Sequence, residues 1–266
     1  MLNQKVKSVR ALERGLDVLL EIQSRRAASL HELHEALGLP KATLLRMLVT
    51  LGSKGLVWQR LADGAYLPHN QNVAENLEIT KERIAEIASP HMETLSSIVA
   101  WPSVLAVPRL DHVEIIETNS PLFRLDAATL GPVGVKLSYI HTATGRAYLA
   151  TCRASERDAI IARLRPKDAS DESEQLLRDI LDATAKQGYS VREPVHPWPD
   201  RSKQMVLRDG RHSMGVVVKA HGDPVASINI TWLNKHTTSQ EVIERHLGAL
   251  QVTARSVGAA LEQSSG

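Results

Sequence analysis

The segment from Gly38 to Gly55 carries hydrogen-bonding side chains along one side of an apolar repeat. Amines, guanidinium groups and hydroxyls on a helix can donate hydrogen bonds to the base edges and phosphate oxygens of a nucleic acid. We expect Thr43, Arg46 and Met47 to face base edges, and Lys41 and Thr50 to face phosphates. A bundle of helices with a solvated cationic face is the alternative interpretation of the same pattern.

Two other groups of residues have the types, but not the spacing, for metal binding or catalysis. The HELH segment at 31–34 separates its histidines by three positions, whereas a zinc-protease helix separates them by four. Cys152 and His141 have the chemistry of a nucleophile and a base, but Cys152 lies about two to three turns into a helix that begins near Ala143. Neither G-x-S-x-G nor a phosphate-binding G-x-x-x-x-G-K occurs. We therefore expect no catalytic residue, no metal site and no cofactor.

Three predicted helices position the hydrogen-bonding segment. The first is amphipathic, with an apolar stripe at helical spacing that consists of Val6, Val9, Leu12, Leu16, Leu19 and Leu20. Ser29 and Glu32 have the spacing of a capping box at the start of the second helix, and Gly38 suits the left-handed residue at its end. Pro40 begins the third helix. Its inward side is expected to consist of Leu44, Leu45, Leu48 and Leu51.

A hairpin is predicted after the third helix. The sequence LVWQRLADGAYLP contains two short extended segments around Asp63-Gly64, a dipeptide suited to a tight turn. Such a hairpin would be the wing of a winged helix-turn-helix. Lys54 and Arg60 lie where a wing commonly contacts phosphate, so they complete the predicted DNA-binding set.

Composition places the chain among proteins large enough for two domains. It has 266 residues, of which 43% are hydrophobic, and its net charge is +2. Residues 1–69 hold ten Lys or Arg against six Asp or Glu, which favours a polyanionic partner for this part. The single cysteine excludes an internal disulfide, and no stretch has the length of a membrane span or the layout of a secretory signal. We expect a cytoplasmic protein with no membrane partner.

The rest of the chain predicts a mixed α/β class, more narrowly an α+β domain. Residues 70–90 have a polar helical pattern that would link the two domains. Antiparallel strand pairs are expected at VLAVPR with VEIIET and at GVVVKA with ASINITWL. Helical patterns occupy residues 143–152, 156–164, 172–187 and 239–261. Strand pairs with segregated helices predict a largely antiparallel sheet over residues 91–266.

Four segments together resemble the IclR family of bacterial transcriptional regulators: VRALERGLDVLLEI, SLHELHEALGLPKATLLRMLVTL, KGLVWQRLADGAYLPH and HTATGRAYLA. The resemblance covers nearly the whole chain. It implies a winged helix-turn-helix over residues 1–69, a linker helix over 70–90 and an effector-binding domain over 91–266. It also implies a homodimer, or a homotetramer formed as a dimer of dimers. WPSVLAV is similar to the subgroup that regulates the breakdown of aromatic acids such as hydroxyphenylpropionates.

The resemblance also implies an effector cavity in the second domain. Carried over residue by residue, its lining consists of Thr129, Ala143, Thr144, Ser213, Asn229 and Thr231. These groups would hold a small carboxylate, with the backbone amides at Ala143 and Thr144 among the donors. Trp198 would close over the ligand with one cation from the long loop, drawn from Arg201, Lys203, Arg208 and Arg211. Ordinary hydrogen bonds within the strands are the alternative for each polar position.

These features predict a transcription regulator that reads a pseudo-palindromic operator in double-stranded DNA under the control of a small-molecule effector. The alternative is a small-molecule hydrolase or transferase with an incidental winged helix. That alternative predicts substrate turnover and a DNA affinity that no ligand changes.

Overall fold

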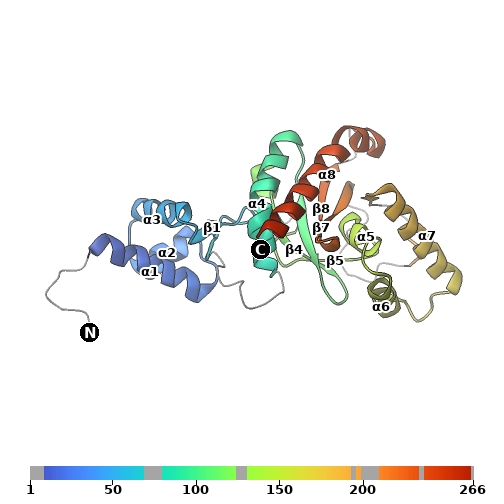
Figure 1. The fold of residues 1–266 in the computed structure, drawn as a ribbon, viewed down its shortest axis with the longest axis horizontal. Helices are drawn as coiled ribbons and strands as arrows, with labels where there is room; N and C mark the ends of the chain where they lie inside the picture. The colour runs from blue at the N-terminus through green and yellow to red at the C-terminus, as the bar shows by residue number, and fades with distance from the viewer. Residues whose placement is uncertain are drawn as a thin grey trace. The chain divides into compact units, whose positions relative to one another are not determined.

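The computed structural model describes residues 9–68, 80–123, 131–192, 196–198, 210–233 and 237–264. The chain divides into two compact units, Met1–Ile79 and Thr80–Gly266. Figure 1 shows a helical first unit and, in the second unit, a sheet covered by helices. The predicted linker region is described from Thr80 onward, and its helix begins at Lys81 within the second unit.

The first unit is a three-helix bundle with a hairpin. Its elements are α1 (Arg10–Arg25), α2 (Leu30–Leu37), α3 (Lys41–Ser53), β1 (Val57–Gln59) and β2 (Tyr66–Pro68). The strands β1 and β2 pair antiparallel, and Ala28 forms a further antiparallel bridge with Tyr66. Ser29 and Glu32 form the predicted capping box, and Gly38 ends α2 with a φ of 63°. These outcomes confirm the expected winged helix-turn-helix arrangement.

The buried side of α1 differs from the predicted one. Val18 and Ile22 are fully buried in the core of the unit, with Leu19 packed beside them. The predicted stripe is exposed along most of its length, at Val9 (65%), Leu12 (61%), Leu16 (47%) and Leu20 (60%). That prediction was wrong because α1 carries two apolar stripes, and the bundle buries the shorter one. Val6 lies outside the described residues.

Two details of the third helix and the hairpin also differ from the predictions. Leu44, Leu48 and Leu51 are buried, but Leu45 is 42% exposed, because it lies to one side of the buried row. The hairpin connection is longer than a two-residue turn. Arg60 donates its backbone N–H to Ala65, and only Gly64 within that connection has a positive φ, at 69°.

The second unit contains a six-stranded sheet in the order β5-β4-β3-β8-β7-β6, with every neighbouring pair antiparallel. This confirms the predicted fold class. The strands are β3 (Val104–Pro108), β4 (Val113–Thr118), β5 (Lys136–Leu137), β6 (Ser190–Val191), β7 (Arg211–Ala220) and β8 (Asp223–Leu233). The remaining elements are α4 (Lys81–Ile98), a 3₁₀ turn (Ser120–Phe123), α5 (Ala143–Leu149), α6 (Ala154–Leu164), α7 (Asp171–Gln187) and α8 (Ser239–Gln263).

Helices cover both faces of this sheet (Figure 1). The helices α4 and α8 pack on each other and on the sheet, and α5 packs on β7 and β8 with α7 beside it. Glycines permit the closest approaches. A Cβ built on Gly215 would lie 2.9 Å from the carbonyl of Ala143 in α5, and one built on Gly258 in α8 would lie 2.0 Å from the Lys219 oxygen. Both contacts hold a helix directly against the main chain of β7.

The close approach of Gly258 to Lys219 predicts that substitution by alanine has opposite effects on stability at two glycines of α8. Gly258→Ala forces α8 away from β7, and we expect it to lower the free energy of unfolding by about 1–3 kcal/mol or more. Gly248→Ala in the same helix is the control, since nothing lies within 4 Å of its built Cβ. Alanine should raise stability there by up to about 1 kcal/mol.

Urea unfolding followed by tryptophan fluorescence measures this difference. Trp101, Trp198 and Trp232 lie in the second unit, so the signal reports mainly on that unit. Equal stability of the two variants would contradict the packing described here.

Candidate nucleic-acid interface and ligand site

The third helix buries one apolar side, and its two cations lie on the exposed remainder of its surface. Leu44, Leu48 and Leu51 are 0%, 2% and 9% exposed and pack against the other helices. Lys41 and Arg46 lie on exposed positions of the helix, and Lys54 follows its end in an exposed position. The α3 sequence, KATLLRMLVTLGS, contains no acidic residue. The exposed surface of α3 therefore offers positive charge to a polyanion, because no acidic side chain on the helix neutralises its cations.

The other predicted residues of α3 are placed less freely. Thr43 and Met47 are half-buried, and Met47 packs against the hydrophobic core. Thr50 is exposed, but its hydroxyl donates to the backbone oxygen of Arg46 at 2.9 Å. Among the predicted residues of this helix, Lys41 and Arg46 therefore have the most accessible donors.

The turn between α2 and α3 is fixed by local hydrogen bonds. Gly38 donates its N–H to the oxygen of His34 at 2.9 Å, and His34 Nδ1 lies 2.8 Å from the oxygen of Leu39. His31 points elsewhere, with Nε2 at 3.9 Å from Glu35. The HELH segment thus contributes to the helix-turn-helix angle, and its two histidines have different partners.

The cationic side chain of the hairpin, Arg60, is bound by a carboxylate of the same hairpin. Arg60 donates two hydrogen bonds to Asp63, from Nε at 3.0 Å and from Nη2 at 2.5 Å. Burial opposes ionisation of Asp63, but the bonds from Arg60 and from the Ala65 N–H outweigh it and lower the pKa of the carboxyl. Arg60 therefore serves the internal structure of the hairpin, which weakens the case that it contacts phosphate. Lys54 remains exposed.

In the second unit, a layer of polar residues lies between α5 and the sheet. Gly215 faces the backbone of α5, as its close approach to Ala143 and Thr144 requires. Residues directly opposite one another in antiparallel strands point to the same side. The register pairs Ser190 with Gly215, Gly215 with Asn229, Ser213 with Thr231, and Val217 with Ser227. We name this set the polar layer: Thr144, Ser190, Ser213, Ser227, Asn229 and Thr231.

Three hydroxyls of the polar layer are buried without a hydrogen-bond partner. They belong to Thr144, Ser190 and Ser227, which are 0%, 1% and 1% exposed. A buried hydroxyl without a partner costs about 1–3 kcal/mol, so most such groups in proteins are paired. Three in one layer indicate a place where a further polar group would be stabilised.

The predicted effector residues fall partly within this layer. Ser213 and Thr231 are opposite each other in the register of β7 and β8. Asn229 lies in the same layer, but its Oδ1 accepts the backbone N–H of Val104 at 3.0 Å. One of its hydrogen-bonding atoms is therefore already used to hold β3. Thr129 lies outside the described residues.

The backbone at the start of α5 does not have the accessibility that the prediction assumed. Thr142 caps this seven-residue helix by accepting the N–H of Gly145. Ala143 and Thr144 are fully buried, and their main-chain atoms press on Gly215. The hydroxyl of Thr144 is buried in this helix without a hydrogen-bond partner.

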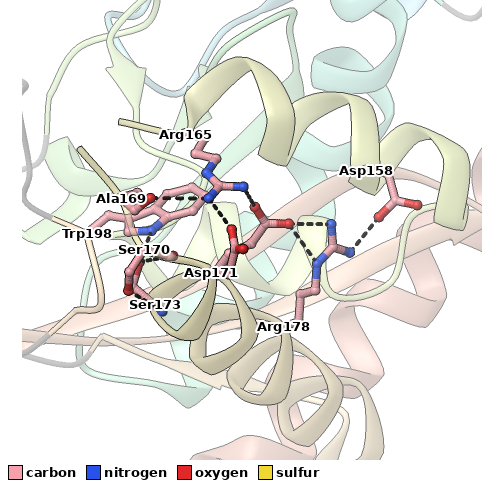
Figure 2. A network of polar contacts seen from close by, with 9 residues as sticks. Asp158, Arg165, Ala169, Ser170, Asp171, Ser173, Arg178 and Trp198 are labelled. Carbon is pink, nitrogen blue, oxygen red and sulfur yellow. Dashed lines mark hydrogen bonds and ion pairs between the residues drawn. The ribbon is translucent and has the colours of Figure 1, made fainter. Parts of the chain in front are cut away.

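Trp198 is not the predicted lid. Its side chain is 2% exposed and belongs to the hydrophobic core between α5, α6 and α7. Figure 2 shows its Nε1 donating to Ser173 Oγ at 3.0 Å, and its backbone oxygen lies 2.9 Å from His141 Nε2. In the same view, Arg165 bonds to Asp171 of α7, and Arg178 bonds to Asp158 of α6. The contacts with Ser173 and His141 fix Trp198 at the start of α7.

The cations near the polar layer come from residues that the sequence prediction missed. Arg146 of α5 is 2% exposed and donates to the oxygen of Val191 at 2.7 Å, and Arg192 is 9% exposed. Both line a cavity of about 610 Å³, within the range typical of ligand sites. None of the twelve lining residues is acidic, and His212, Ser239 and Gln240 are among them. Arg192 also donates its backbone N–H to Ser213 at 2.9 Å.

Of the cations named for the lid, Arg211 is in β7 and the other three lie outside the described residues. One feature of the sequence pointed to Arg192, namely its place at the start of the long loop. Arg192 directly follows the two-residue strand Ser190–Val191, and so short a strand shows no periodicity from which its pairing with β7 could be predicted. A second cavity, of about 220 Å³, lies beside Trp198 and is smaller than most ligand sites.

Cys152 has the surroundings of a core residue. It is 8% exposed, and its Sγ lies 3.4 Å from the oxygen of Leu149. Burial, with the negative charge of Glu156 nearby, raises the pKa of the thiol to about 12. A thiolate nucleophile at neutral pH is therefore not formed here. Within the described ranges, no group of three or more metal-ligating side chains gathers, and no helix is long and apolar enough to cross a membrane.

Comparison with known proteins agrees with this architecture. A family model for the IclR helix-turn-helix domain matches residues 11–61. The acetate operon repressor of Salmonella typhimurium strain LT2 is 28% identical over 256 residues, which cover 92% of this chain and 87% of the repressor.

Two solved structures share the fold. IclR of Thermotoga maritima has a TM-score of 0.54 at 18% identity and covers 95% of this chain and 99% of its own. An IclR homolog of Microbacterium hydrocarbonoxydans, complexed with 4-hydroxybenzoate, has a TM-score of 0.53 at 18% identity with the same coverage.

The structure combines a winged helix-turn-helix unit, whose residues 11–61 match the model of the IclR helix-turn-helix domain, with a second α/β unit. The chain is therefore similar to IclR-family transcriptional regulators over most of its length, in agreement with the resemblance of the sequence. The matched proteins are regulators rather than enzymes, which agrees with the expectation that this chain is not an enzyme.

The environment of Cys152 predicts an inert thiol. At pH 8 the native chain should react with a chromogenic disulfide reagent over minutes to less than about a tenth of a thiol, because a pKa about four units above the pH leaves little thiolate. The chain unfolded in guanidinium is the control and should yield one thiol, since the sequence has one cysteine. Rapid reaction of the native chain would reopen the nucleophile interpretation.

Proposed function

We propose that the chain is a ligand-controlled regulator whose paired winged helices bind a pseudo-palindromic operator. The observation that carries the proposal is the cationic side of α3, held outward by three buried leucines within the matched helix-turn-helix domain. A recognition helix of this kind enters the major groove. Because the matched relatives from Salmonella and Escherichia coli are named repressors, we infer that the bound state represses transcription.

The exposed stripe of α1 supports a homodimer. Its apolar side chains follow helical spacing and leave a continuous uncovered strip on the first unit: Val9, Leu12, Leu16 and Leu20. Soluble proteins tend to cover such patches. A second copy that covers the strip by two-fold symmetry would place two recognition helices on two half-sites. The resemblance to the family also implies that two dimers pair into a tetramer, and we keep this pairing as part of the proposal.

The effector site that we propose is the polar layer. A ligand oxygen would supply the missing partners of Thr144 and Ser190. Arg146, on the same helix as Thr144, and Arg192, two residues after Ser190, line a cavity that does not include the polar layer, and they would attract a carboxylate. The arginines replace Trp198 and the loop cations of the original prediction. Ser213, Thr231 and the free atoms of Asn229 stay in the proposed site.

We further propose an aromatic carboxylate as the ligand class. Two observations support it, namely the similarity of WPSVLAV to the aromatic-acid subgroup and the 4-hydroxybenzoate bound by the Microbacterium homolog. Binding of ligand and DNA to the same dimer would be linked, so the factor by which the ligand changes DNA affinity equals the factor by which DNA changes ligand affinity. A hydrolase or transferase would instead consume the ligand.

Two substitutions distinguish a residue that recognises the base sequence from a residue that binds any DNA through its phosphates. Arg46→Ala should cost about 1–3 kcal/mol of binding to the preferred duplex and relax the preference at one base pair per half-site. Lys54→Ala should weaken binding to all duplexes alike and reduce the salt dependence by about one charge per contact. Fluorescence anisotropy across a salt series, with the preferred and a scrambled duplex, measures both. Unchanged discrimination by Arg46→Ala would remove that residue from the base-reading set.

Thr144→Val tests the ligand site with little effect on folding. The hydroxyl of Thr144 has no partner, so the substitution should leave the melting temperature unchanged or raised. It should weaken a bound carboxylate about tenfold, since one hydrogen bond to the ligand is lost. The ligand is first sought by thermal shift with benzoate, 4-hydroxybenzoate and acetate, and 4-hydroxybenzamide serves as the uncharged control.

Ser103→Ala is the matched control variant, because Ser103 also has a buried unpaired hydroxyl but lies beside Asn119 rather than in the polar layer. It should bind the acid as the parent does. If no acid raised the melting temperature, the carboxylate class would be refuted. If Thr144→Val bound the acid as tightly as the parent, Thr144 would not belong to the site.

A further inference from the structure

Two branched apolar side chains lie exposed on α3, among its cations. Val49 is 72% exposed and Leu45 is 42% exposed, and they are four residues apart, so they lie on one side of the helix. Neither belongs to the core of the first unit, whose α3 members are Leu44, Leu48 and Leu51, with Met47 packed against them. Isolated exposed apolar residues are common, so exposure alone does not assign them a role.

Their position on the helix does distinguish them. With 3.6 residues per turn, the direction opposite the buried leucines is occupied by a ridge at spacings of four, three and four residues: Ala42, Arg46, Val49 and Ser53. Val49 therefore lies on the same outward ridge as Arg46, and Leu45 flanks it. Any duplex that Arg46 reaches must also meet Val49.

The major groove offers one apolar group that such side chains can recognise. It is the C5-methyl group of thymine, and apolar side chains discriminate it from cytosine, which has no methyl there. Contact between two hydrated apolar groups removes both from water, which favours the thymine by an amount set by the area covered. A hydroxyl or amine at the same positions would gain nothing from that methyl.

We infer that Val49 and Leu45 are specificity-determining residues that contact thymine methyl groups beside the base read by Arg46. The inference rests on the proposed DNA-binding function and adds which base these side chains select, namely thymine. Val49 follows Arg46 by three residues, a rise of about 4.5 Å along the helix, which is close to one base-pair step of about 3.4 Å. The thymine contacted by Val49 therefore lies within about one or two base pairs of the Arg46 contact.

The test uses the full chain and duplexes in which single thymines are replaced by deoxyuridine, which removes only the methyl group. The preferred duplex is first obtained by in vitro selection from a random library, and affinities are then measured by fluorescence anisotropy at one salt concentration. We expect a thymine in each half-site whose replacement weakens binding about three- to tenfold. For Val49→Ala, which removes both γ-methyl groups, the same replacement should change affinity less than about 1.5-fold. Val49→Thr keeps one γ-methyl group that can still contact the thymine methyl, so it should retain part of the loss. Leu45→Ala should remove sensitivity at a different thymine.

The controls keep the outcomes separate. Val49→Thr preserves the shape of the side chain, and both positions are exposed, so melting temperatures should stay within the error of the parent. Replacement of a thymine outside the two half-sites should leave the affinity unchanged. If every deoxyuridine duplex bound the parent as tightly as the original, or if the losses persisted undiminished in the alanine variants, the inference would be overturned. Failure of selection to enrich any sequence would instead overturn the proposed function.

Discussion

The burial of one side of α3 constrains everything that its opposite side can do. Leu44, Leu48 and Leu51 pack with Val18 and Ile22 of α1 in a core that excludes water. Because successive residues of a helix point in directions 100° apart, this packing also fixes the outward direction of Arg46 and Val49. In the proposed function, the geometry of a DNA contact is thus set by leucines on the buried side of the helix. A cavity in this core would displace the donors as well as destabilise the unit.

The proposed ligand site of the second unit is built in the opposite way. Instead of exposing polar groups on a packed scaffold, this unit buries them between α5 and the sheet, where Gly215 permits the close approach of Ala143. The unpaired hydroxyls of Thr144 and Ser190 make this layer less stable than a fully paired one. A ligand that satisfies them stabilises the form of the unit that binds it, and this preference is the physical basis for any coupling to DNA.

Local signals in the sequence predicted the elements well. The capping box at Ser29, the left-handed Gly38 and the strand pairs each depend on residues close together in the chain, and the structure confirms them. The choice between two apolar stripes on α1 depends on tertiary packing, so the wrong stripe was predicted. Leu45 was misplaced for the same reason, because a run of leucines does not show which of them faces the other helices.

The candidate ligand site was only partly accessible to the same reasoning. The resemblance to the family, carried over residue by residue, assigned Ser213 and Thr231 to the effector site, and the register of β7 and β8 pairs them. Ser190 escaped notice because its two-residue strand carries almost no periodic signal. Asn229 was assigned to a ligand, but part of its side chain holds the N–H of Val104, a contact between residues 125 positions apart that only the fold reveals.

Methylation protection of guanine N7 measures most directly whether the outward side of α3 enters the major groove, since that atom lies in the groove. With the full chain bound to its selected duplex, guanines should be protected from dimethyl sulfate in two half-sites about one helical turn, or a multiple of it, apart. Arg46→Ala should restore reactivity at one guanine in each half-site. Saturating binding with every guanine as reactive as in free DNA would contradict the account.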